Sequence, residues 1–172
     1  QYLSRGLYGV DVKSTVTPIE RNRVNVSIAA VEGEISRIRS ITFTGNTVFS
    51  DGVLRGQMEL STPNWLSWYT KRDQYSRQKL SADLENVRSY YLNRGYLDFK
   101  IDSVQVSISP DKRDIFVSIN VSEGERYTVS GVKLTGELLG LDEELQPLVD
   151  VKTGEVFSAE KINAIAKRVT DR

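Results

Sequence analysis

The sequence predicts an α+β fold built from tandem modules, each with two helices packed on a three-stranded mixed sheet. Three observations lead to this prediction. The sequence repeats itself after about ninety residues, residues 96–122 alternate apolar and polar side chains as a β-hairpin does, and a helical stripe of apolar residues precedes that hairpin. Within one repeat the elements follow the order strand, helix, helix, strand, strand.

The repeat is visible in short matching segments. Residues 2–6 (YLSRG) correspond to residues 91–95 (YLNRG) at a shift of 89 positions. Residues 31–33 (VEG) correspond to residues 122–124 (SEG) at a shift of 91 positions, and apolar residues between these segments follow the same register. A unit of this length is suited to a small independent module.

These matches divide the chain into three parts. Residues 1–33 form the C-terminal β-hairpin part of one module, residues 34–124 a complete module, and residues 125–172 the N-terminal part of the next module. The linkers between these parts are only a few residues long. We therefore expect interdomain hinges at Glu32, Gly33 and Glu34, and at Glu123, Gly124 and Glu125.

The hairpin of the complete module contains the candidate site. Its second arm places Ile115, Val117, Ile119 and Val121 on one face. In its first arm the apolar residues change from odd positions (Phe99, Ile101) to even ones (Val104, Val106, Ile108), which predicts a β-bulge near Asp102–Ser103. Because bulges concentrate at sheet edges, we expect this strand to be an exposed edge strand.

The other strands and the first helix of the complete module follow from periodicity and capping residues. Arg37–Thr44 is predicted as a strand with Ile41 and Phe43 facing the core and Ile38 on the opposite face. Ser50 or Asp51 caps a short helix that runs to about Met58. In the following module, residues 127–135 are predicted as the first strand.

Three further helices are predicted. The longest runs from Asp73 to about Arg94 and ends at Gly95, and its charged residues are interpreted as a solvated face. Its apolar stripe consists of Leu80, Leu84, Val87 and Tyr91, and its charged residues are Arg77, Lys79, Asp83, Glu85 and Arg88. Residues 141–149 form a short helix, and Ser158 caps the last one.

Composition argues against most enzymatic and nucleic-acid-binding functions. The 23 basic residues balance the 23 acidic ones, and the chain has neither cysteine nor histidine. Thiol catalysis, histidine-based catalytic triads and the usual zinc sites are thereby excluded. The sequence contains no phosphate-binding glycine motif and no GxxG loop of an RNA-binding KH module. Asp98, Asp102 and Glu85 lack a defined catalytic spacing, so we expect no enzyme, metal or cofactor.

The loop from Pro63 to Tyr69 carries two tryptophans, Trp65 and Trp68. The simpler interpretation is that these rings pack between the two helices. The alternative is that exposed aromatic rings contact a partner or a glycan.

The complete module resembles a known family. The similarity extends over essentially the whole chain and is carried by residues 75–80 (YSRQKL), 83–85 (DLE), 88–92 (RSYYL), 94–96 (RGY), 101–103 (IDS) and 105–107 (QVS). These segments resemble the BamA family of outer-membrane β-barrel assembly proteins of Gram-negative bacteria. The chain is similar to the end of the second POTRA domain, the whole third and the start of the fourth.

This resemblance implies a scaffold at the periplasmic face of the outer membrane rather than a catalyst. The implied partners are unfolded outer-membrane proteins bound by β-augmentation, accessory Bam lipoproteins of the BamB-like β-propeller kind, and the protein's own C-terminal membrane β-barrel, with no nucleic acid. The implied edge strand is Lys100, Ile101, Asp102, Ser103, Val104, Gln105, Val106, Ser107 and Ile108. Within it, Asp102, Val106 and Ile108 are the implied lipoprotein contacts.

Two alternatives stay open. The first is a purely structural scaffold that holds lipoproteins without binding clients. The second is a peptidoglycan-binding module that uses Trp65 and Trp68.

Overall fold

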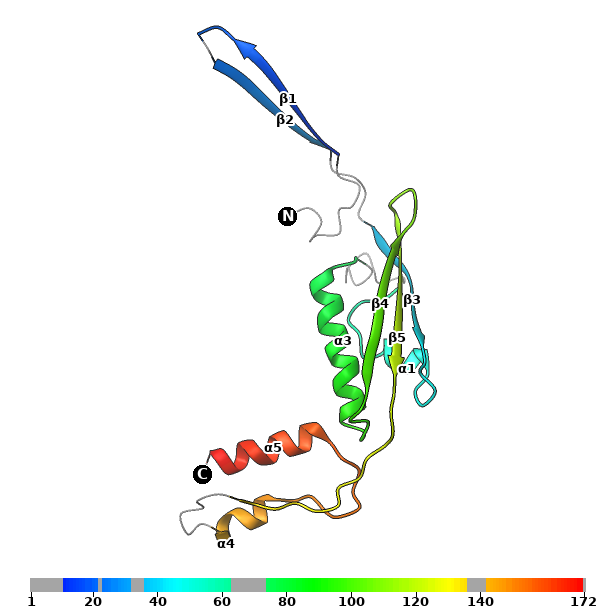
Figure 1. Cartoon of the computed structure of the whole chain (residues 1–172), viewed down its shortest axis with the longest axis vertical. Helices are drawn as coiled ribbons and strands as arrows, with labels where there is room; N and C mark the ends of the chain where they lie inside the picture. Colours follow the sequence, from blue (N-terminus) through cyan, green and yellow to red (C-terminus); the bar gives the residue numbers. More distant parts are fainter. Residues whose placement is uncertain (1–10, 22, 32–35, 63–73, 136–141, 172) are drawn as a thin grey trace. The chain divides into compact units, whose positions relative to one another are not determined.

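The computed structural model describes residues 11–21, 23–31, 36–62, 74–135 and 142–171 (Figure 1). Its strands are β1 (Asp11–Ile19), β2 (Arg23–Val31), β3 (Arg37–Thr44), β4 (Lys100–Ile108) and β5 (Asp114–Ser122). Its helices are α1 (Asp51–Arg55), α3 (Arg77–Leu92), α4 (Asp142–Leu145), the 3-10 helix η2 (Gln146–Leu148) and α5 (Ala159–Thr170). The predicted loop with Trp65 and Trp68 and the predicted helix start at Asp73 lie outside these residues.

The strands form two separate sheets. β1 and β2 pair as an antiparallel hairpin, while β3, β5 and β4 form a three-stranded mixed sheet in that order. β5 is therefore the central strand, and β3 and β4 are the two edge strands. This arrangement confirms the predicted α+β fold class.

The central strand β5 follows the predicted alternation. Ile115, Val117, Ile119 and Val121 are buried, whereas Phe116 on the other face is 41% exposed. A strand that alternates strictly over nine residues buries one whole row of side chains, so β5 contributes more to the core than either edge strand does.

Strand β3 matches the prediction at its end but not at its start. Ile41 and Phe43 are buried as predicted, but Ile38 is buried as well, at 0% exposed, so its assignment to the opposite face was wrong. Ile38 and Ile41 are three residues apart, so the buried set changes parity within the strand, which strict alternation does not anticipate. The start of β3 is also held to the β4–β5 turn, because Arg37 N donates to Arg113 O at 2.8 Å.

Helix α1 is shorter than predicted. It ends at Arg55, with Gly56 as its C-cap, rather than near Met58, and Gly56 N donates to Gly52 O at 3.1 Å. Two glycines within so few residues weaken a helix, which accounts for the early end. Leu54 in the helix and Met58 beyond it are nevertheless buried.

Helix α3 carries the predicted apolar stripe. Leu80, Val87 and Tyr91 are buried and Leu84 is half-buried. The helix ends two residues before the predicted Arg94, and Gly95 follows with a φ of +92°. A left-handed residue favours glycine, so the predicted stop at Gly95 is confirmed.

The chain divides into two compact units, each with its own buried side chains. Unit 1 comprises Gln1–Thr42, Met58–Asp83 and Val104–Ile119, and unit 2 comprises Phe43–Gln57, Leu84–Ser103 and Asn120–Arg172. Buried apolar residues of unit 1 are Ile38, Ile41, Met58, Leu60, Tyr75, Leu80, Ile115, Val117 and Ile119. Those of unit 2 are Phe43, Leu54, Val87, Tyr91, Tyr96, Phe99, Val121, Leu145 and Ile165.

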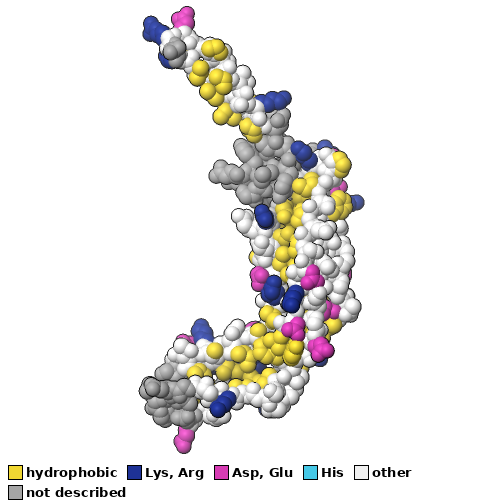
Figure 2. Space-filling view, viewed as in Figure 1, with side chains coloured by type: hydrophobic (Ala, Val, Ile, Leu, Met, Phe, Trp, Pro, Cys, Tyr) yellow, Lys and Arg dark blue, Asp and Glu magenta, His cyan; other side chains and the backbone are white. Residues whose placement is uncertain are grey.

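The hairpin β1–β2 exposes an apolar face, seen as hydrophobic side chains along it in Figure 2. The register places Val16 opposite Val26 and Val12 opposite Ala30, and these pairs lie on one face. At the repeat shift, Val26 corresponds to the buried Val117 of β5.

The predicted strand at residues 127–135 is not formed. Within the described residues it makes a single bridge, Thr128 with Val156, supported by Val129 N donating to Glu155 O at 2.8 Å. A strand requires a neighbour that continues the ladder of backbone hydrogen bonds. Among the described residues, this ladder stops after Val129. Val132 beyond them is 44% exposed.

The last helices follow the prediction more closely. The predicted helix over residues 141–149 appears as α4 followed by η2, with Pro147 at the start of η2. The predicted cap of α5 is confirmed, because Ser158 Oγ accepts a hydrogen bond from Lys161 N at 3.3 Å.

Candidate functional site

The edge strand β4 is the candidate site. The strand order β3-β5-β4 gives β4 one neighbour, β5, and no strand lies on its other side among the residues that the structure describes. The strand is nine residues long, Lys100–Ile108, and has the bounds of the predicted edge strand. Its outer N–H and C=O groups are therefore placed to pair with another extended chain.

The turn of the hairpin indicates which N–H groups of β4 point outward. Ser109 N donates to Asp114 O at 2.9 Å, so this N–H points toward β5. Because N–H directions alternate along an antiparallel strand, the N–H groups of Val106 and Ile108 point away from β5. Gln105 and Ser107 then use their N–H groups within the sheet.

The side chains of β4 show the predicted change of parity. Ile101 and Val104 are both half-buried although they are three residues apart, so the inward positions shift between them. This shift is what led us to predict a bulge near Asp102–Ser103, and the bulge itself stays a prediction. Val106 and Ile108 are 38% and 40% exposed, so the second half of the strand offers accessible apolar side chains.

The predicted lipoprotein contacts are all accessible. Asp102 is exposed and accepts a hydrogen bond from Ser122 Oγ of β5 at 2.6 Å, so its carboxylate is held in place. Val106 and Ile108 add exposed apolar surface on the same strand. Their contact with a lipoprotein stays a prediction.

The other edge strand, β3, is occupied by groups of the same chain. Arg37 near its start forms an antiparallel bridge with Gln74. Near its end, Phe43 N donates to Asp51 Oδ2 at 3.3 Å, and Asn46 Nδ2 donates to Asp51 Oδ1 at 2.9 Å. Because these contacts block both ends of β3, β4 is the longer open edge.

A buried carboxylate secures the end of the hairpin. Glu123, the residue after β5, is only 7% exposed and accepts hydrogen bonds from Thr47 N at 2.8 Å and Thr47 Oγ1 at 2.6 Å. Val48 N donates to it at 3.0 Å and Tyr91 Oη at 2.7 Å. Four donors from a loop and a helix thus converge on one side chain, although its sequence context predicted a linker residue.

The surroundings of Glu123 fix its ionisation state. Burial raises the pKa of Glu123, but the hydrogen bonds from Thr47, Tyr91 and Val48 outweigh it, so the pKa lies below the ordinary value of 4.5. Burial, followed by the hydrogen bond to Glu123, raises the pKa of Tyr91. Glu123 is thus a carboxylate and Tyr91 a neutral donor at neutral pH.

This arrangement predicts a stability that falls with acidification. A folded-state pKa below 4.5 means that the stabilisation is complete above that value and is lost as the pH falls through the lower folded-state pKa. In Glu123→Gln we expect a smaller loss of unfolding free energy between about pH 6 and about pH 3 than in the parent chain. Urea unfolding at a series of pH values measures this loss of unfolding free energy. Equal losses in both proteins would contradict the prediction.

The predicted hinge residues fall in different environments. Glu32, Gly33 and Glu34 lie outside the described residues. Gly124 has a φ of +71°, and a Cβ there would lie 2.7 Å from Asp98 Cβ, while Glu125 is exposed. The hinge stays a prediction, and within it the side chain of Glu123 is held by the hydrogen bonds described above.

Asp83 on α3 was wrongly interpreted as part of a solvated face. It is 1% exposed, and its carboxylate accepts hydrogen bonds from Glu59 N at 2.7 Å and Leu60 N at 2.9 Å. Its position within the charged stripe of α3 concealed this role, because partners more than twenty residues away leave no local signal.

Neither a metal-ligand cluster nor a membrane-spanning helix occurs among the described residues. They contain no group of three or more acidic, histidine or cysteine residues placed to hold a metal ion. None of their helices is long and apolar enough to cross a membrane.

Comparisons with known proteins agree with this architecture. The POTRA family, described as a surface antigen variable number repeat, matches residues 36–124 and 127–172. The outer membrane protein assembly factor BamA of Neisseria meningitidis serogroup B is 32% identical over 173 residues, which cover 100% of this chain and 22% of that protein. BamA of Buchnera aphidicola is 28% identical over 171 residues, which cover 98% of this chain and 27% of that protein.

A solved structure is similar as well. The crystal structure of Haemophilus influenzae BamA POTRA3-5 superposes with a TM-score of 0.65 at 27% sequence identity, covering 78% of this chain and 53% of that chain. This chain spans only 22% and 27% of the two BamA proteins named above. Together, the repeat, the mixed sheet with its two helices and the match over both modules show that this chain belongs to the POTRA family and that its relatives are BamA proteins.

Proposed function

We propose that this chain is part of the periplasmic arm of an outer-membrane protein assembly factor, and that β4 captures unfolded β-barrel clients as an added strand. The likeness to BamA over the whole chain supports the general role. The open edge of β4 is the observation that supports the mechanism. The complete module, residues 34–124, then acts as a scaffold rather than as a catalyst.

Main-chain pairing suits clients that share no side-chain sequence. Every extended client offers the same N–H and C=O groups, whatever its residues. Each such hydrogen bond contributes only about 0.5–1.5 kcal/mol net, and ordering the client costs free energy. Capture along β4 is therefore weak and reversible, as transfer to the membrane barrel requires.

A second candidate function is the docking of an accessory lipoprotein on the same strand. The exposure of Val106 and Ile108 next to the held carboxylate of Asp102 favours it. Apolar side chains flanked by a charge at a fixed position give side-chain recognition of a folded partner. This mode differs from client capture because it depends on side chains more than on backbone groups.

A proline in β4 separates the two modes. Val106→Pro removes an outward N–H without removing a bond to β5, and we expect it to lower client cross-linking from a photoreactive group at Ser107 about tenfold. Val106→Ala keeps the N–H and shortens the side chain, so it should retain client cross-links and weaken those to the lipoprotein.

The same experiment can contradict the proposal. Client cross-links that survive Val106→Pro, or that fall equally in Val106→Ala, would show that backbone pairing on β4 does not hold the client. Far-UV circular dichroism and melting temperature establish that both variants are folded. Gln105→Pro serves as the contrast, because its N–H belongs to the β4–β5 ladder and its loss should destabilise the sheet.

A further inference from the structure

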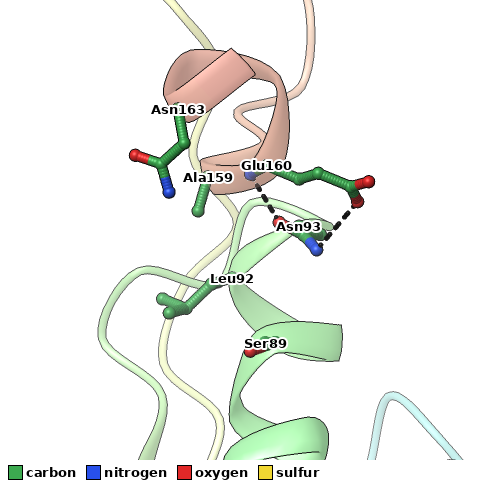
Figure 3. A pocket seen from close by; sticks show the side chains of 6 residues that line it. All are labelled: Ser89, Leu92, Asn93, Ala159, Glu160 and Asn163. Atoms are coloured by element: carbon green, nitrogen blue, oxygen red, sulfur yellow. Dashed lines mark hydrogen bonds between the residues drawn. The ribbon is translucent and has the colours of Figure 1, made fainter. Parts of the chain in front are cut away.

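The end of helix α3 and the start of helix α5 meet in unit 2, although they are more than sixty residues apart in the sequence (Figure 3). Asn93 directly follows α3, and its Oδ1 accepts a hydrogen bond from Glu160 N at 2.8 Å. Glu160 is the second residue of α5, whose first N–H groups have no acceptor within the helix. The side-chain amide of the residue that follows α3 thus caps α5.

The contact is reciprocal. Asn93 Nδ2 donates to Glu160 Oε2 at 3.3 Å, so one side chain both accepts from the backbone and donates to the carboxylate of the same residue. Ser158 caps the next N–H of the same helix, that of Lys161. The two caps satisfy different N–H groups, so Asn93 adds to the local cap rather than replacing it.

Further contacts connect the residues that follow α3 with Tyr127. Tyr127 N donates to Gly95 O at 2.8 Å, and Tyr127 Oη donates to Asp98 Oδ2 at 2.7 Å. A Cβ on Gly95 would lie 2.7 Å from Tyr127 O and 3.0 Å from Val156 Cγ1. The two backbones are therefore in close contact. The lack of a side chain at Gly95 permits this contact as well as the left-handed turn at the end of α3.

We propose that Asn93 is a positioning residue that caps α5 from outside and, together with the Asp98–Tyr127 bond, fixes the orientation of α5 relative to α3. The segment from Glu123 to Tyr127 then acts as a clamp between the complete module and the next one. Asn93 suits this role because only a side chain with both a donor and an acceptor makes both bonds to Glu160. The inference does not depend on client capture by β4.

The chain contains no cysteine, so spin labels can be placed without background. We choose Arg55→Cys on α1 and Lys167→Cys on α5, because both residues are exposed and lie in unit 2. Pulsed electron–electron double resonance on the full chain should give one narrow distribution of distances between the two labels. Adding Asn93→Ala and Tyr127→Phe should widen that distribution about twofold.

Two further variants make the test specific. Asn86→Ala changes an exposed amide on α3 and should leave the distance distribution unchanged. Asn93→Asp combined with Glu160→Gln reverses donor and acceptor between the side chains while keeping the acceptor for Glu160 N, and should restore the narrow distribution.

Three results would overturn the proposal. The first is a broad distance distribution in the labelled parent, which a free hinge at Glu123–Glu125 would give. The second is a narrow distance distribution in Asn93→Ala/Tyr127→Phe. The third is a loss of hydrogen-exchange protection along all of α5. The last result would show that Asn93 stabilises the helix without orienting it. We expect exchange in Asn93→Ala to increase at Glu160 N and to remain slow at Lys167 and Arg168.

Discussion

Gly45→Ala is expected to destabilise the complete module more than any other alanine substitution of a described glycine. Gly45 has a φ of +86°, and a Cβ there would lie 2.1 Å from Val121 O and 3.2 Å from Val121 C. Both atoms belong to the backbone of the central strand, so no side chain can rotate away. The left-handed strain and the forced displacement of β5 together amount to about 2–5 kcal/mol of unfolding free energy.

Gly154→Ala is the matched control. Gly154 has a φ of +84°, nearly that of Gly45, but no atom lies within 4 Å of a Cβ built there. It therefore isolates the backbone strain, about 1–2 kcal/mol, from the collision with β5. Urea unfolding followed by far-UV circular dichroism gives both values. Equal effects of the two substitutions would show that β5 does not approach Gly45 as closely as described.

Glu123→Ala is the second substitution with a large expected effect. It leaves the N–H groups of Thr47 and Val48, at a part-buried loop, and the buried hydroxyl of Tyr91 without their acceptor. A buried donor that loses its acceptor costs about 1–3 kcal/mol, whereas water can replace the acceptor of the two loop N–H groups, so we expect a loss of about 2–3 kcal/mol. Chemical denaturation of the full chain measures this loss.

The neighbouring acidic residue provides the comparison for Glu123. Glu125 is exposed, and Glu125→Ala should leave the unfolding midpoint almost unchanged. Tyr91→Phe removes a single donor and keeps the ring, which stacks on Phe99 at a centroid distance of 4.0 Å. The unfolding free energy of Tyr91→Phe should therefore lie between those of Glu123→Ala and Glu125→Ala. A Glu123→Ala variant as stable as Glu125→Ala would contradict the buried network.

Local periodicity predicted those parts of the fold that local forces determine. The alternation of Ile115, Val117, Ile119 and Val121 identified the strand with the most buried row, and Gly95 marked the end of α3. The repeat and the odd-to-even change in β4 led to the edge strand. In each case the signal lies within a few residues of the feature that it predicts.

Features that depend on distant partners were missed or wrong. Glu123 was assigned to a linker because Thr47 and Val48, which hold it, are about 75 residues away in the sequence. Asp83 was assigned to solvent for the same reason. Residues 127–135 have strand-like composition, but in the part of the chain that the structure describes their backbone pairing stops after Val129, and composition alone does not supply a neighbour.

The parity shift in β4 limits which guest sequences fit well. A visiting strand with strict alternation can match its apolar side to the half that contains Val104, Val106 and Ile108, or to the half that ends at Ile101, but not to both. The favourable overlap is thus about half a barrel strand. If β4 captures clients as proposed, so short a match favours short-lived binding in several registers, and successive segments of one client would replace one another without full release.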